Sequence, residues 1–151
     1  AVAAPAAPAA APTEPAGSTA PRVVLLSSRF DRATGVSEVS VAWRGLTAVG
    51  RAAGSPLAGA AQATLTAVEA LGAVVPYFLT SVDRAATERG TPVVVSLAVR
   101  EVAAGDGAAR RRVGVAEGGD DVEAASRATL SALNRLLALA PAAGSGWSGA
   151  R

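Results

Sequence analysis

The sequence predicts an α+β fold made of two β-β-β-α units, with mostly antiparallel sheets packed against two helices. Hydrophobic periodicity switches between the two-residue spacing of strands and the three- to four-residue spacing of helices, in the same order in each half of the chain. A glycine-led, helix-like stretch at 117–137 also resembles an earlier one at 52–71. We therefore expect one domain of two repeats, 22–72 and 73–140.

Both ends of the chain are expected to lie outside this domain. Residues 1–21 consist largely of alanine and proline, a composition that disfavours helix and strand and favours extended conformers. We interpret 1–21 as a disordered tail or linker and 141–151 as a flexible C-terminal tail. The predicted single α+β domain therefore spans 22–140.

Three strands are predicted before the first helix. Residues 22–28 form a short run rich in Val and Leu, and apolar and polar residues alternate over 36–43, as in a half-buried strand. Arg-Gly at 44–45 suits a tight turn, after which 46–52 can return as a third strand.

The first helix is expected to begin at Pro56, where proline leaves no intrahelical donor missing, with Ser55 as its cap. Gly72 is expected to end it. Its apolar stripe comprises Leu57, Ala60, Ala61, Thr64, Val68 and Leu71.

The second half repeats this order, with predicted strands at 74–83, 91–102 and 111–117. Asp120 is expected to cap the second helix, because side-chain oxygens and acidic groups suit a helix start. Its apolar stripe comprises Val122, Ala125, Thr129, Leu133, Leu136 and Leu137. The two helices align without gaps when Gly54 is matched to Gly119, which indicates an internal duplication.

The composition excludes several classes of chemistry. Cysteine and histidine are absent, which rules out disulfides, thiolate nucleophiles, Cys/His zinc sites and histidine-based triads. All basic residues are arginines, so Schiff-base and P-loop lysines are missing as well. We predict no catalytic residue, no metal site and no cofactor, and expect catalysis only if the chain is a fragment of a larger enzyme.

Nucleic acid and membranes are not expected partners. The basic cluster at 109–113 falls on a predicted strand, where its side chains alternate between faces, and no aromatic pair accompanies it. No apolar run approaches the ~20 residues that span a bilayer.

The loops that precede the two helices are the best candidates for a binding site. Backbone N–H groups at a helix start can hold a carboxylate or phosphate, although glycine also simply lets a strand turn into a helix. The paired aspartates of the second loop would attract an ammonium group, and their position at the helix start explains them without catalysis. The candidate residues are Gly54, Ser55, Gly118, Gly119, Asp120 and Asp121.

The β-β-β-α duplication, the stretch "GSPLAGAAQAT" at 54–64 and the stretch "DDVEAASRATLSALNRLL" at 120–137 resemble the C-terminal regulatory (dimerisation) domain of 2-isopropylmalate synthase. The similarity covers roughly 36–138. It is carried in the first unit by Gly54, Pro56 and Leu57, which match the glycine-rich loop and Pro-Leu of that family, and in the second by Ala125, Ser126 and Asn134. The chain departs from the family in having a single glycine before Ser-Pro and alanine at 124 in place of a frequent glutamate.

This resemblance implies a regulatory domain that binds leucine between its paired units and signals to a separate catalytic barrel. We therefore expect a non-catalytic regulatory or assembly module that senses a small carboxylate or amino acid. It would form a homo-oligomer, such as a dimer, or pair with a larger partner protein, and it would act in the cytoplasm, where the resembled family acts. The alternative is a structural or scaffold protein without a ligand, tethered to a larger complex through its Ala/Pro tail.

Overall fold

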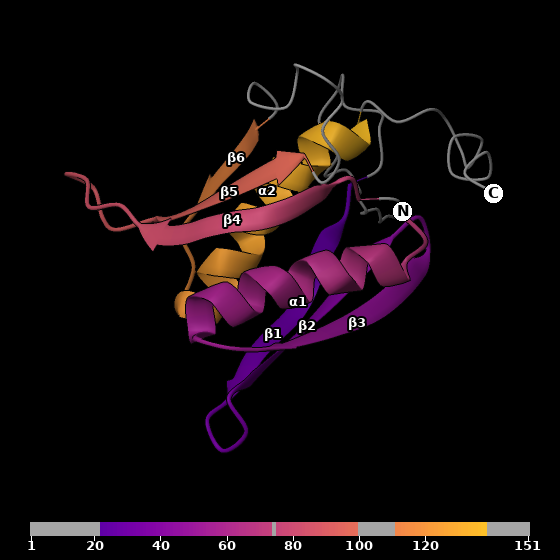
Figure 1. The fold of residues 1–151 in the computed structure, drawn as a ribbon, viewed down its shortest axis with the longest axis horizontal. Helices are drawn as coiled ribbons and strands as arrows, with labels where there is room; N and C mark the ends of the chain where they lie inside the picture. Colours follow the sequence, from indigo (N-terminus) through magenta and orange to yellow (C-terminus); the bar gives the residue numbers. More distant parts are fainter. Residues whose placement is uncertain (1–21, 74, 100–110, 139–151) are drawn as a thin grey trace, which may run out of the picture.

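The computed structural model describes residues 22–73, 75–99 and 111–138, and these form two three-stranded sheets and two helices (Figure 1). The first unit comprises β1 (Val24–Asp31), β2 (Val36–Trp43), β3 (Leu46–Ala53) and α1 (Pro56–Ala70). The second comprises β4 (Tyr77–Arg84), β5 (Val93–Val99), β6 (Arg111–Ala116) and α2 (Asp121–Ala138). All strand pairs are antiparallel, so the predicted α+β fold with a repeated β-β-β-α order is confirmed.

The element boundaries differ from the predicted ones mainly at the first strand of each unit. β1 extends to Asp31 because this residue still pairs with Val36 on β2. β4 begins at Tyr77, directly after Pro76, whose missing N–H makes it a poor strand residue. The predicted strand at 91–102 is shorter at its start, and its last three residues lie outside the described part of the chain, as do the tails 1–21 and 141–151.

The β2–β3 hairpin is closed by the predicted Arg-Gly turn. Arg44 has φ 54° and Gly45 has φ 80°, and Trp43 pairs with Leu46 across the turn. Two consecutive positive φ values are the requirement of a two-residue type I′ turn, which matches the natural twist of the strands. The register of this hairpin is therefore set locally.

The core lies between the inner faces of the two sheets and the helices. Val39 and Val41 on β2 are fully buried, as are Val95 and Leu97 on β5. Alanine is the commonest buried residue of both helices, which lets them approach closely to one another and to the strands. Two buried side-chain atoms have no hydrogen-bond partner in the described part of the chain, the Oγ of Ser37 on β2 and the Nε of Arg112 on β6.

Each helix packs on the third strand of its own sheet at a glycine. A Cβ at Gly50 of β3 would lie 2.5 Å from the backbone nitrogen of Ala67 and closer still to the carbonyl oxygen of Ala63. A Cβ at Gly114 of β6 would meet α2 in the same way, 2.7 Å from the nitrogen of Ala132. The two glycines thus occupy equivalent places and allow direct backbone-to-backbone packing.

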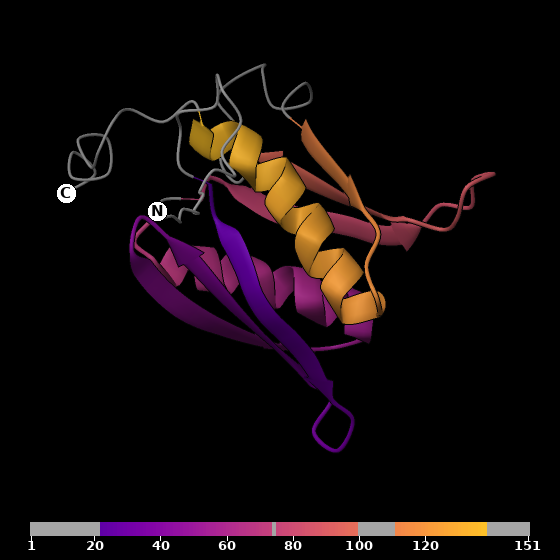
Figure 2. The same ribbon diagram turned by 180° about the vertical axis from the view of Figure 1, so that it is seen from behind.

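The two units are interlocked. The helices contact each other, α2 also contacts β1, and α1 contacts β4 (Figure 2). The Asn134 side chain on α2 accepts a hydrogen bond from the Val23 N–H at 2.9 Å and donates one to the Val23 carbonyl at 3.2 Å. The described helices include none that is long and apolar enough to cross a membrane.

Candidate functional site

Both helices begin at the same end of the molecule, and both starts are capped by the predicted residues (Figures 1 and 2). The Ser55 Oγ accepts a hydrogen bond from the Ala58 N–H at 3.2 Å, and Gly54 turns the chain into α1 with φ 135°. The Asp120 Oδ1 accepts from the Glu123 N–H at 2.8 Å. The roles of Ser55 and Asp120 as caps are thereby confirmed.

The second loop is more tightly closed than the first. The Glu123 side chain reaches back and accepts a hydrogen bond from the N–H of Gly119, the residue before the cap, so Glu123 fastens the loop to the first turn of α2. This hydrogen bond, assisted by the Arg127 guanidinium, holds the pKa of the Glu123 carboxyl below its usual range. A Cβ at Gly118 would lie 2.7 Å from the nitrogen of Ala124, so this glycine packs directly on the helix.

A cavity of about 630 Å³ lies where the two helix starts meet the tip of the first hairpin. We call it the helix-start cavity. Its apolar and charged groups come from three elements that are far apart in sequence: the end of β1, the first residue of α1 and the start of α2. The lining residues are Phe30, Arg32, Pro56, Asp120, Asp121 and Val122.

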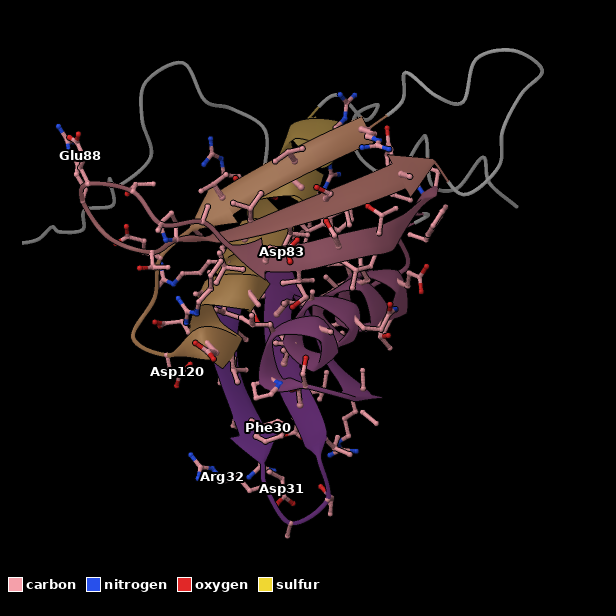
Figure 3. The ribbon with its side chains drawn as sticks, turned by 60° about the vertical axis from the view of Figure 1, so that its left-hand side comes forward. Phe30, Asp31, Arg32, Asp83, Glu88 and Asp120 are labelled. Atoms are coloured by element: carbon pink, nitrogen blue, oxygen red, sulfur yellow. The ribbon has the colours of Figure 1, made fainter. Side chains whose placement is uncertain are left out.

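Arg32 is placed at this cavity by the turn between β1 and β2. The Gly35 N–H donates to the Asp31 carbonyl at 2.8 Å, and the Gly54 N–H donates to the Gly35 carbonyl at 3.1 Å, so the turn is fastened to the loop before α1. Figure 3 shows Phe30 and Arg32 near the tip of this hairpin, with Asp120 facing that region from the start of α2. A cation and an anion therefore stand on two different elements of the cavity wall.

The two aspartates have different surroundings. Asp121 forms an ion pair with Arg84 of β4, and both side chains are partly exposed. Asp120 uses Oδ1 for the cap, and within the described part of the chain its Oδ2 has no hydrogen-bond partner. Asp120 is thus the acidic group that can accept a further donor from within the cavity.

A second cavity, of about 520 Å³, lies on the other side of Asp120, between the edge strand β1 and α2. Of the predicted site residues it includes Gly119 and Asp120. Its remaining lining residues are Leu25, Leu26, Ser27, Ser28, Glu123 and Arg127.

No protein-family model matches this chain, and a search of curated proteins gave no match. Function is therefore inferred from the geometry of the chain itself. Within the described ranges, no three acidic side chains come together as a metal site would require.

The structure brings only part of the predicted site together. Asp120 and Asp121 line the helix-start cavity, whereas Gly54, Ser55 and Gly118 are absent from the described walls of both cavities. The Gly119 N–H already donates to Glu123, so it is not an open donor for a ligand carboxylate. Phe30 and Arg32 were not predicted, because the approach of the first hairpin to α2 depends on packing between distant segments.

Proposed function

We propose that this chain is a non-catalytic regulatory module that binds a small amino acid in the helix-start cavity. One observation carries the proposal: Arg32 and Asp120 stand on different walls of a cavity that also contains the apolar side chains of Phe30 and Val122. An α-amino acid is a zwitterion with a side chain, and this set of groups offers a partner to each part. The Arg32 guanidinium suits a carboxylate, and the Asp120 carboxylate suits an ammonium group.

The size and electrostatics of the site support this class of ligand. A volume of about 630 Å³ falls within the range of small-molecule pockets. The positive ends of two helix dipoles add to Arg32 in attracting a carboxylate. The apolar walls, Phe30 and Val122, favour an aliphatic side chain over a polar one.

A regulatory role follows from the resemblance to the regulatory domain of 2-isopropylmalate synthase, and the repeated β-β-β-α order supports that resemblance. The proposal includes action in the cytoplasm, where that family acts, and partnership with another copy or a larger protein. In the alternative proposal the chain is a scaffold without a ligand, tethered through residues 1–21.

Binding is tested by the thermal stability of the full chain in millimolar L-leucine. A ligand present at about ten times its dissociation constant stabilises the native state by about 1.4 kcal/mol. Two analogues probe the charges separately: 4-methylpentanoate lacks the ammonium group, and 3-methylbutylamine lacks the carboxylate. We expect the intact amino acid to raise the melting temperature and each analogue to do so far less.

Two variants assign the effect to this cavity. Arg32→Gln removes the cation, and Asp120→Asn removes the anion while keeping an oxygen that can cap α2. Both should abolish the shift, whereas Arg89→Gln, an exposed arginine of the β4–β5 loop that lines neither cavity, should leave it unchanged. If no amino acid shifts the melting temperature of the folded chain, sensing is rejected and the scaffold alternative stands.

A further inference from the structure

The outer face of the second sheet is exposed and largely apolar. Its outward residues form three cross-strand rows, because alternate residues of each strand point away from the helices. Phe78, Val113 and Val115 are 42%, 44% and 51% exposed. Figure 3 shows β4, β5 and β6 crossing the front of the molecule. The rows are Asp83–Val94–Val115, Ser81–Ser96–Val113 and Phe78–Ala98–Arg111, which we call the β4–β6 face.

The first sheet provides an internal comparison, because the two units have the same register. The register shifts between Leu25 and Ser27 on β1 and between Leu79 and Ser81 on β4, and Gly50 and Gly114 occupy equivalent places on the third strands. The outer rows of the two sheets can therefore be matched. The corresponding rows of the first sheet are Arg29–Glu38–Arg51, Ser27–Ser40–Val49 and Val24–Ala42–Thr47.

The two faces differ most in the row that is charged in the first sheet. There, Glu38 accepts a hydrogen bond from the Arg29 Nε at 3.0 Å and another from the Arg51 Nε at 2.7 Å. This cluster spans all three strands and suits a surface in water. The matching positions of the second sheet hold Asp83, Val94 and Val115, so two of the three charged groups are replaced by valine.

The charges that remain on the β4–β6 face lie at opposite corners. Asp83 stands near the end of the edge strand β4, and Arg111 stands at the start of the other edge strand, β6. Neither forms an ion pair with any described residue. Between these corners the paired rows hold valine, alanine, phenylalanine and two serines, and the exposed Thr80 hydroxyl, at the irregularity of β4, donates to the Ser96 carbonyl at 2.9 Å. The pattern is a largely apolar centre with one acidic and one basic corner.

We propose that the β4–β6 face binds a second copy of itself. The two copies are related by a two-fold axis that lies in the plane of the interface and passes over Ser96. This axis is perpendicular to the line that joins Asp83 and Arg111, so it exchanges their positions. Two copies related by this axis form the Asp83–Arg111 pair twice and cover each other's apolar centre. Such an interface is isologous, and the strands of the two copies cross steeply, as in orthogonal sheet packing.

A second copy fits this face better than an unrelated partner because the face is complementary to itself. The acidic and the basic corner each find a partner of opposite charge when two copies of the same face pack together. The interface does not include the helix-start cavity, so the test of dimer formation does not depend on whether the chain binds an amino acid.

The mass of the full chain in solution tests this interface. Sedimentation equilibrium at about 100 µM should give a dimer. Val113→Arg places a charge in the apolar centre and should raise the dimer dissociation constant tenfold or more, so that the variant sediments mainly as a monomer at the same concentration. The matched control is Val49→Arg, at the equivalent and similarly exposed position of the first sheet, which should remain dimeric. The melting temperature and circular dichroism of both variants establish that they fold.

A charge exchange tests the orientation of the two copies. Asp83→Arg or Arg111→Asp alone places like charges together and should weaken the dimer about tenfold, whereas the double exchange should restore it. The proposal is overturned if the wild-type chain is monomeric, if Val49→Arg dissociates the dimer and Val113→Arg does not, or if the double exchange is as weak as either single variant.

Discussion

Replacing Gly114 with alanine should destabilise the fold strongly, because α2 rests on the backbone of β6 at this point. The added Cβ would lie 2.7 Å from the nitrogen of Ala132, about 0.7 Å inside the 3.4 Å at which ordinary contact begins, and closer still to the Ala128 carbonyl oxygen. The obstructing atoms are helix backbone and cannot rotate away. α2 must therefore move as a unit from the second sheet.

The cost can be estimated from this displacement. A gap of 0.5–1 Å forfeits a quarter to a half of the dispersion energy along a packed interface, and overpacking typically costs about 1–3 kcal/mol. The loss of chain freedom in the unfolded state offsets up to about 1 kcal/mol. Because the obstructing atoms are backbone, the upper end of the overpacking range applies, and we expect a net loss of about 2 kcal/mol, which in a domain of this size lowers the melting temperature by about 8 °C.

Urea unfolding followed by circular dichroism measures this loss. Gly119→Ala is the matched control, because its Cβ would have only a 3.4 Å contact with the flexible Glu123 side chain. A Gly114→Ala chain that unfolds within about 0.5 kcal/mol of the wild type would refute the reasoning.

Three further predictions concern single side chains. Ser37→Ala should stabilise the fold by about 1 kcal/mol in urea unfolding, since the buried Oγ has no partner among the described residues; a loss of stability would mean that the hydroxyl is hydrogen-bonded. Asp120→Ala should cost about 1 kcal/mol by removing the α2 cap, and Asp120→Asn should cost much less; equal losses would contradict the cap. Hydrogen bonds from Arg51 and Arg29 lower the pKa of Glu38. The stability that Glu38 contributes is therefore complete above about pH 4.5 and is lost as the pH falls through its folded pKa. In the Glu38→Gln variant, the free energy of unfolding should therefore fall less steeply between pH 7 and pH 3 than in the wild type. The same pH dependence in the variant and the wild type would show that Glu38 does not contribute to the loss of stability in acid.

The strands and helices could be predicted because their signals are local. The alternation of apolar and polar residues over 36–43 predicts β2 with the observed limits. The capping residues Ser55 and Asp120 predict where the two helices begin. The predicted first strand ended three residues before the end of β1, because the last residues of β1 are held by pairing with β2, which no pattern within β1 records.

The candidate site could be predicted only on the helix side. Asp120 and Asp121 stand out in the sequence as an acidic helix start, and both line the helix-start cavity. Arg32 is one arginine of many in the sequence, and its place depends on how the first hairpin meets α2. The close approach at Gly114 has a weak local signal, a glycine inside a strand, but its partner on α2 is fixed only by packing.

The pairing of Val23 with Asn134 joins residues 111 positions apart, and each helix also touches the first strand of the other unit. The chain therefore has a single interior that neither half contains. A half-length polypeptide would leave the inner surface of its helix in water until it met a matching half, much as a protomer of an obligate dimer does. Slow amide exchange in β1 would accordingly report on whether α2 is in place, and heating should melt both units in one transition.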